Sequence, residues 1–275
     1  MYSATIHNPA IAINRVPVYL AINKKKAQRY MLCLEMAGTV IRDFFPGKQA
    51  AATSLFQTLG QVACCIDNHL DDLNFQQKEK LLELFPGFFD SLGEQANEII
   101  FGDRLWQLCD QLDTSLYPPS LCTDLYQFYC FCKKHELIEE LKIFSIIVIE
   151  SAILKSRAKN GKEILQSLAM EGNAAVSFLL QLSEKEGCIK NDRKSKKLKN
   201  YLGRLEKMLN IADDLSDFKK DKAKGTITLK TSSSYYFTLS GKLLKTFFST
   251  IFNYHFLFLK HFFVFTGRYI RSELS

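Results

Sequence analysis

Apolar residues recur at intervals of three and four along most of this chain. That spacing places them on one face of an α-helix, so it predicts helices and not strands. The clearest series runs through Leu55, Leu59, Val62, Ile66, Leu70 and Leu73. An earlier series from Met31 to Phe45 ends at Pro46-Gly47, a pair that stops helices. Because no segment shows the sustained alternation typical of strands, we predict an all-α fold.

Further helices are expected where the same periodicity continues. They cover 93–116, 120–134, 136–158, 162–184 and about 198–222. Pro86-Gly87 and Pro118-Pro119 predict breaks between elements, and the polar segment 184–197 predicts a loop. A length of 275 residues suits one large domain. We therefore expect an N-terminal extension over 1–24 and a single helical-bundle domain over 25–275.

The C-terminal segment 235–274 is rich in phenylalanine and very apolar. A membrane-spanning helix needs about 20 consecutive, mainly apolar residues. Polar residues interrupt any such window here: Lys242, Lys245, Asn253, His255, Lys260 and His261. We therefore expect a buried terminal helix. Peripheral contact with a membrane surface or with a hydrophobic protein partner is the alternative.

The composition is that of a globular protein, with 47% hydrophobic residues, 24% charged residues and a net charge of +7. Lysines concentrate at 24–26, 190–199 and 219–224, but no nucleic-acid-binding motif accompanies them, so we expect no nucleic-acid partner. The eight cysteines form no CxxC pair and no zinc-binding pattern. They indicate a reducing, cytoplasmic compartment, and membrane association through 235–274 stays open.

Two acidic clusters carry most of the candidate chemistry. The first contains Asp67, Asp71 and Asp72, within the helix that begins near Leu55. At about 3.6 residues per turn, Asp67 and Asp71 share one face of that helix. The same stripe continues through Ala63, Gly60 and Phe56. Small residues beneath an acidic pair predict a pocket with a metal-binding mouth and an apolar shaft.

The second cluster lies on the helix expected over 198–222. Its members recur at helical spacing: Asn210, Asp213, Asp214, Asp217 and Asp221. Like charges at this spacing repel one another unless a cation neutralises them. Oxygen ligands at this density suit Mg²⁺ or Mn²⁺. A solvated acidic face that pairs with nearby lysines explains either cluster alone. Two clusters, each on an apolar helix, favour a shared divalent-metal site that clamps a diphosphate.

The two motifs resemble those of the class I isoprenoid synthase superfamily. Asp67-x-x-x-Asp71-Asp72 is similar to the first motif of its squalene/phytoene synthase branch and of related terpene synthases. Asn210-x-x-Asp213-Asp214-x-x-Asp217 resembles that branch's Asn-containing second motif and the DDxxD of trans-prenyltransferases. The following Lys222-Ala223-Lys224-Gly225-Thr226 resembles the Lys/Gly/Thr stretch behind that motif. The resemblance covers about residues 25–230 and implies the helical bundle of this superfamily.

The resemblance also implies a reaction. Asp67, Asp71, Asp213 and Asp217 would be catalytic. The implied metal ligands are Asp67, Asp71, Asp72, Asn210, Asp213, Asp214, Asp217 and Asp221. They would hold a cluster of about three Mg²⁺ ions, with Mn²⁺ as the alternative, as in other metal-assisted displacements of phosphate groups. An allylic prenyl diphosphate would ionise there, releasing diphosphate and leaving a carbocation that is cyclised or eliminated to a terpene.

The chain departs from the chain-elongating prenyltransferases at two places. Asn74-Phe75-Gln76-Gln77-Lys78 stands where those enzymes have paired arginines, and Leu209 precedes Asn210 where they have Phe-Gln. Both differences favour a terpene synthase. Three alternatives stay open: coupling of prenyl diphosphates in the squalene/phytoene manner, chain elongation, and a non-catalytic helical protein that binds a membrane or a partner.

Other candidate residues complete the expected site. Arg204, Lys220 and Lys224 are candidates for the substrate diphosphate, and Phe56, Gly60, Gly172 and Phe178 for the cavity wall. Gly172 lies inside a helical run, where glycine costs about 1 kcal/mol relative to alanine. It predicts either a break in the helix beside the ionisation site or a close helix crossing. Enzymes of this kind are often dimers, so a homodimer is a further expectation.

Overall fold

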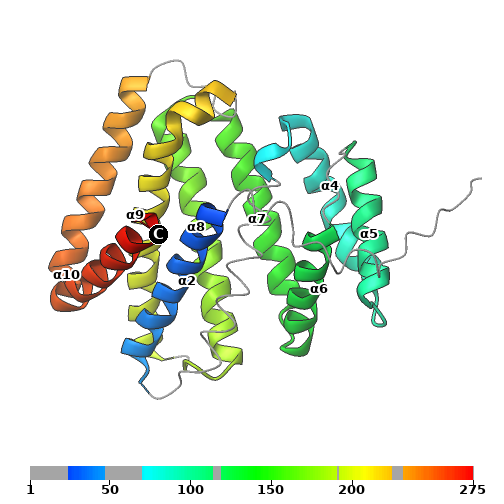
Figure 1. Cartoon of the computed structure of the whole chain (residues 1–275), viewed down its shortest axis with the longest axis horizontal. Helices are drawn as coiled ribbons and strands as arrows, with labels where there is room; N and C mark the ends of the chain where they lie inside the picture. The colour runs from blue at the N-terminus through cyan, green and yellow to red at the C-terminus, as the bar shows by residue number, and fades with distance from the viewer. Residues whose placement is uncertain (1–23, 47–69, 114–118, 191, 225–231, 275) are drawn as a thin grey trace, which may run out of the picture.

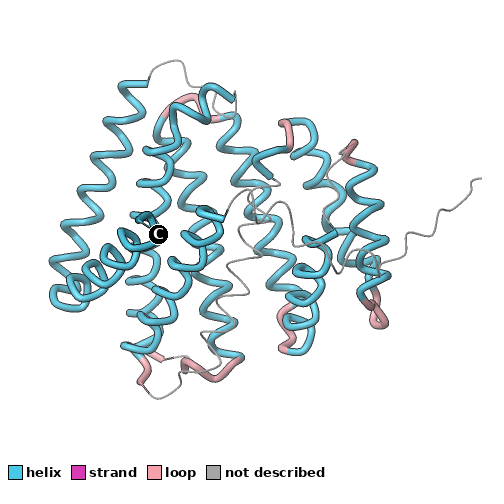
Figure 2. The backbone as a smooth tube through the Cα atoms, in the orientation of Figure 1, coloured by secondary structure: helices cyan, strands magenta, loops and turns pink. Residues whose placement is uncertain are grey.

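Every regular element in the described part of the chain is an α-helix. The computed structural model describes residues 24–46, 70–113, 119–190, 192–224 and 232–274. Its elements are α2 (Lys24–Phe44), α4 (Phe75–Leu92), α5 (Glu98–Gln111), α6 (Pro119–Lys134), α7 (Ile138–Arg157), α8 (Gly161–Lys185), α9 (Arg193–Lys224) and α10 (Ser232–Leu274). Figure 2 shows helices joined by short loops and no strand in these ranges. The all-α prediction is confirmed.

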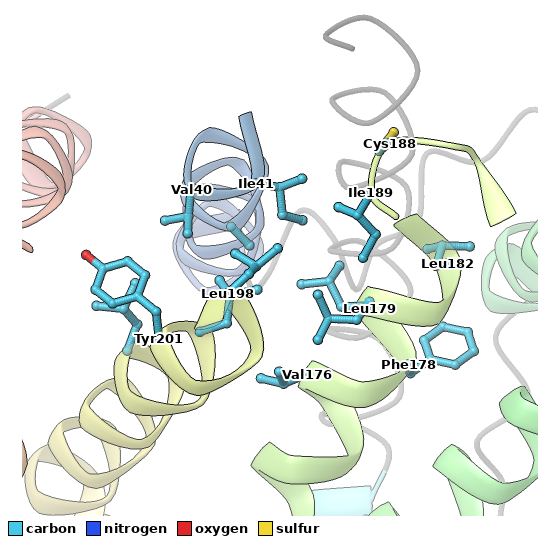
Figure 3. Close-up of a cluster of buried hydrophobic side chains, with 14 of the residues drawn as sticks. Val40, Ile41, Val176, Phe178, Leu179, Leu182, Cys188, Ile189, Leu198 and Tyr201 are labelled. Atoms are coloured by element: carbon cyan, nitrogen blue, oxygen red, sulfur yellow. The ribbon is translucent and has the colours of Figure 1, made fainter. Parts of the chain in front are cut away.

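The helices form two groups that meet at α7. On one side α8 and α9 pack against each other and against α2 and α10, and on the other α4, α5 and α6 pack together (Figure 1). One buried cluster joins α2, α8 and α9 through side chains such as Val40, Leu179, Leu182 and Leu198 (Figure 3). A second cluster fills the space between α4, α5, α6 and α7. Burial of these apolar faces is the main force that holds the helices together.

The helix α4 contradicts the break predicted at Pro86-Gly87. Pro86 lies inside this helix, which runs from Phe75 to Leu92. A proline inside a helix removes one hydrogen bond and costs about 3 kcal/mol. Phe88 compensates because it is buried, with its ring 5.4 Å from Phe101 and 5.5 Å from Phe89. Asn74 also caps the first turn, since its side chain accepts from the Gln77 N–H at 2.9 Å.

The helix α9 begins earlier than expected, so the predicted loop over 184–197 is wrong for its last part. The Asp192 carboxylate accepts hydrogen bonds from the N–H groups of Lys194 at 2.7 Å and Ser195 at 2.9 Å. An aspartate at this place satisfies amides that have no partner inside the helix. The lysine-rich segment from Arg193 is therefore the first turn of α9, and not a loop.

The helix α10 is only partly the buried terminal helix that we expected. It bends at His255, whose backbone has φ 26° and ψ −107°, so two helical arms meet there. Tyr235, Leu239 and Phe258 are buried against the bundle. Other aromatic side chains of α10 are exposed, Phe252 by 81% and Phe256 by 84%. The periodicity predicted the helix, but it did not predict that one side of the helix is buried and the other is exposed.

A buried chain of hydrogen bonds fixes the C-terminal arm of α10 to α9 and α2. The Tyr201 hydroxyl lies 2.9 Å from His261 Nδ1, and His261 Nε2 lies 2.8 Å from Asp43 Oδ2. Lys260 donates to the same carboxylate oxygen at 2.6 Å. Burial lowers the pKa of His261 even though the hydrogen bond to Asp43 opposes that shift. A neutral imidazole that donates from Nε2 and accepts at Nδ1 satisfies this arrangement.

Replacing Tyr201 with phenylalanine is expected to lower the free energy of unfolding by about 1–3 kcal/mol, because it leaves the buried Nδ1 of His261 without its donor. Urea denaturation measures this change. Tyr254→Phe is the matched control, since the Tyr254 hydroxyl donates only a long 3.4 Å bond at the surface. Equal losses in both variants would mean that the hydroxyl of Tyr201 has no special part in the stability.

Candidate functional site

The second acidic cluster lies on α9, and its side chains point in different directions. Asp213 is exposed, Asn210 and Asp217 are partly buried, and Asp214 is buried. The negative charge of Asp213 contributes, after burial, to raising the pKa of the Cys33 thiol on α2 to about 11. Asp213 is therefore close enough to Cys33 of α2 for its charge to act on the thiol. The predicted residues Asp221, Lys220 and Lys224 belong to α9, but their side chains lie outside the described part.

Asp214 is held by two neighbouring helices. Lys155 on α7 forms an ion pair with it, with Nζ 2.6 Å from Oδ1. The Tyr235 hydroxyl at the start of α10 donates to the Asp214 carbonyl at 3.1 Å and lies 3.4 Å from Oδ2. Asp214 is only 4% exposed, so these partners replace its hydration. Sequence reasoning placed Asp214 among the metal ligands, whereas here its carboxylate joins α7, α9 and α10.

Asn210 pairs with an acidic residue one turn earlier on α9. Its Nδ2 donates a hydrogen bond to Glu206 Oε1. Because the amide nitrogen points to Glu206, the amide oxygen Oδ1 is directed elsewhere. Glu206 in turn fills the space above Gly172 of α8, where an added Cβ would lie only 1.9 Å from Glu206 Oε2. Gly172 therefore allows the Glu206 carboxyl to enter the α8–α9 contact.

The sequence predicted either a break in the helix or a close helix crossing at Gly172. The contact with Glu206 and the course of α8 decide between these two structures. The helix α8 continues without interruption from Gly161 to Lys185. The predicted break at Glu171-Gly172-Asn173 is therefore wrong, and the close helix crossing is correct. A helix can continue through glycine when tertiary packing compensates for its low propensity. Here the absent side chain leaves room for a carboxyl group of the neighbouring helix.

A buried polar cluster surrounds Glu206 between α7, α8 and α9. The Ser151 hydroxyl lies 3.2 Å from that of Ser167 and 3.4 Å from Glu171 Oε2. Burial, together with the negative charge of Glu171, raises the pKa of Glu206 to about 8, although Asn210 and Lys207 oppose the shift. At neutral pH the carboxyl group of Glu206 is therefore mostly protonated. We call Ser151, Ser167, Glu171, Glu206 and Asn210 the inner polar cluster.

Cations border this cluster on the side of α10. Burial lowers the pKa of Lys207, and the nearby Lys242 lowers it further. Arg204, a predicted diphosphate ligand, donates to Ser249 Oγ of α10 at 2.6 Å. Lys155 of α7 adds a cation beside Asp214. Lysines therefore lie near Glu206 and Asp214 of α9, whereas Arg204 lies on the side of the helix opposite Asp213.

The first acidic cluster is only partly described. Asp67, Phe56 and Gly60 lie outside the described residues. Asp71 and Asp72 are exposed at a helical turn that ends just before α4, and the neighbouring Leu70 and Leu73 pack into the α4–α7 cluster. Among the described residues, no three His, Cys, Asp or Glu side chains converge as a metal site would require. A metal site shared by both clusters thus stays a prediction.

The remaining cavity candidate, Phe178, lies in the aromatic core. Its ring stacks on Phe144 at 5.2 Å and meets Phe128 edge-on at 6.0 Å. Sequence reasoning did not assign roles to Lys155, Ser151 or Glu206. Glu206 could have been found, because it precedes Asn210 by one turn on the same stripe. The two serines carry no sequence signal, since isolated serines on apolar helices are common.

Comparison with known proteins adds no assignment. No protein-family model, no curated protein and no solved structure matches this chain. Within the described ranges, none of the helices combines the length and the apolar character that crossing a membrane requires.

Proposed function

We propose that this protein is a Mg²⁺-dependent enzyme that ionises an allylic prenyl diphosphate, in the manner of class I terpene synthases. The observation that carries the proposal is the helical spacing of Asn210, Asp213 and Asp217 on α9, with Asn210 bonded to Glu206 in the inner polar cluster of an all-helical bundle. Coupling of two prenyl diphosphates is the second candidate, because the same motif pattern occurs in that branch of the superfamily.

The chemistry of the donors on α9 fits a hard divalent cation. Asn210 offers its amide oxygen Oδ1, since its nitrogen donates to Glu206. Asp213 and Asp217 add carboxylates one and two turns further along the helix. Asp71 and Asp72 would supply the opposing ligands. A bound Mg²⁺ cluster would withdraw negative charge from the diphosphate leaving group as the C–O bond breaks.

The protein's own side chains would bind and orient the substrate. Lys155 and Lys207 present positive charge near Asp214 and Glu206 of α9, which suits the oxygens of a diphosphate. Arg204 instead donates to Ser249 of α10. Glu206 holds its proton at neutral pH, so it adds little negative charge beside the diphosphate. The apolar faces of α8 and α9 would exclude water from the carbocation.

Incubation of the purified chain with geranyl, farnesyl and geranylgeranyl diphosphates and Mg²⁺ tests the proposal. We expect diphosphate release from one substrate alone, with a terpene product detected by mass spectrometry; release only with two substrates would favour coupling. Asp71→Ala and Asp217→Ala should each lower turnover by about a hundredfold or more, because electrostatic groups at a reacting centre have effects of this size. Asp103→Ala, an exposed aspartate on α5, is the matched control.

The proposal fails if no substrate releases diphosphate from a folded protein and if Mg²⁺ with diphosphate leaves the melting temperature unchanged. A binding-only protein would show the thermal shift without turnover. If both alanine variants fail to fold, these aspartates stabilise the structure. The variants Asp71→Asn and Asp217→Asn then show whether turnover depends on the negative charge, because asparagine keeps the size of the side chain.

A further inference from the structure

The outer face of α10 exposes a continuous row of apolar side chains. Its first arm presents Phe237 (85% exposed), Leu244, Phe248 and Phe252, and its second arm presents Phe256, Leu259, Phe262, Phe263 and Val264. Figure 1 shows that the first arm of α10 forms the outer edge of the bundle. Exposed apolar surface on this scale marks a binding surface more often than a solvated face.

The exposed apolar residues of the first arm lie along one side of the helix. Phe237, Leu244, Phe248 and Phe252 follow one another at intervals of seven and four, which keeps them on one side of the helix. Along the first arm they span roughly 22 Å at about 1.5 Å per residue. Beyond the bend at His255, the second arm begins with the exposed Phe256. The opposite side of the arm is buried, as Tyr235, Leu239 and Thr250 show.

Positive charge borders this row. From Ser232 to Ser272 the chain contains no acidic residue and five cations, Lys242, Lys245, Lys260, Arg268 and Arg271. Two of them, Lys260 and Arg268, form ion pairs with Asp43 and Glu35 of α2. Lys245 is exposed in the middle of the first arm. The basic start of α9 also lies beside the bend, because the Tyr254 hydroxyl donates to the Lys197 carbonyl at 3.4 Å. Lys196, Lys197 and Lys199 are all exposed there.

We propose that the outer face of α10 docks on the surface of an anionic lipid bilayer, with its phenylalanines in the interface and the lysines against the headgroups. Aromatic residues on one face of a helix and lysines beside them are the features of helices that lie in the plane of a membrane. This inference does not depend on the proposed catalytic function.

A second copy of this chain fits the face less well. In a twofold dimer the same patch meets itself, so an interface on this face would bring together two copies of the positive charges of Lys245 and the start of α9. An anionic surface instead complements them, and each nearby cation strengthens binding to such lipids. Charge thus favours the bilayer over self-association.

Flotation of the full chain with lipid vesicles tests the proposal. We expect co-flotation with phosphatidylcholine vesicles that contain phosphatidylglycerol, weaker binding to phosphatidylcholine alone, and a loss of binding at high salt. Phe252→Ser combined with Phe256→Ser should lower the partition constant by about tenfold or more, since burying one phenylalanine is worth at least that factor. Both side chains are more than four-fifths exposed, so the fold should tolerate the change.

Ile99→Ser provides the matched control, because Ile99 is 57% exposed on α5, away from α10. Its binding should equal that of the wild type. Equal flotation of the double variant and the wild type would overturn the proposal. Sedimentation of the wild type as a dimer that the double variant dissociates, without vesicle binding, would also overturn it and assign the face to a second copy.

Discussion

Replacing Glu206 with glutamine is expected to remove most of the decline in stability that the wild-type protein undergoes as the pH rises from about 4.5 to about 8. Burial raises the pKa of this carboxyl group from 4.5 to about 8. The unfolded chain loses the proton near pH 4.5, whereas the folded chain keeps it until about pH 8. Between these values the folded state binds more protons, so raising the pH favours unfolding.

The size of this effect is on the order of 4 kcal/mol at pH 8, because the rise in pKa from 4.5 to about 8 corresponds to about 1.4 kcal/mol for each pH unit. Urea denaturation of both proteins at a series of pH values measures it. The glutamine variant should be the more stable protein above pH 8, with the difference shrinking towards pH 4.5. Glutamine still offers an acceptor to Asn210, so the hydrogen bond between the two side chains can persist.

Glu83→Gln serves as the control, since Glu83 is exposed on α4. It should change neither the stability nor its dependence on pH. A parallel pH dependence in the wild type and in the Glu206→Gln variant would show that Glu206 ionises in the folded protein as it does in water. Gly172→Ala gives a second test, because its methyl group would displace the Glu206 carboxyl. Displacement towards water should weaken the same pH dependence.

Removing the carboxylate of Asp214 is expected to lower the free energy of unfolding by about 3 kcal/mol or more. The Asp214→Ala variant removes the ion pair with Lys155 on α7 and one acceptor of the Tyr235 hydroxyl. Because Asp214 is buried, water cannot fully replace these contacts. Thermal and urea denaturation report the loss without any need for an activity assay.

The double variant Lys155→Met, Asp214→Leu tests whether the charge pair or its packing matters. Apolar pairs of similar volume often replace buried ion pairs without loss, so most of the stability should return. Asp90→Ala is the surface control: Lys142 lies 2.7 Å from Asp90, but Asp90 is 68% exposed. That pair should contribute less than about 1 kcal/mol. Equal losses at both pairs would contradict the importance of burial at Asp214.

Much of the helical architecture could be predicted from periodicity, and each of its exceptions has a physical cause. At Pro86 the burial of Phe88 outweighs a local penalty. At Gly172 a partner helix compensates for the missing side chain. At Arg193 a single capping aspartate, Asp192, begins a helix inside a polar run. At Pro86 and Gly172 contacts with other helices decide the structure, so a local pattern could not reveal it. Asp192, in contrast, is a local capping signal that the prediction of a loop over 184–197 overlooked.

The candidate site shows the same limit. The stripe of Asn210, Asp213 and Asp217 was visible in the sequence, because its members share one helix. The ion pair of Lys155 with Asp214 joins residues far apart in the chain, and the contact of Glu206 with Gly172 does so as well. Only the packing of α7 and α8 against α9 brings such residues together. Spacing along one helix could therefore predict the motif but not its partners.

The fit of Glu206 above Gly172 constrains how this protein can diverge. A side chain at position 172 needs the volume that the Glu206 carboxyl now fills. Descendants that acquire alanine or serine at 172 should therefore carry a shorter residue at 206, and those that keep a long acid at 206 should keep glycine at 172. Positions 172 and 206 are therefore expected to vary together among related sequences. A substitution that changes the helix crossing at 172 would also change the residue at 206.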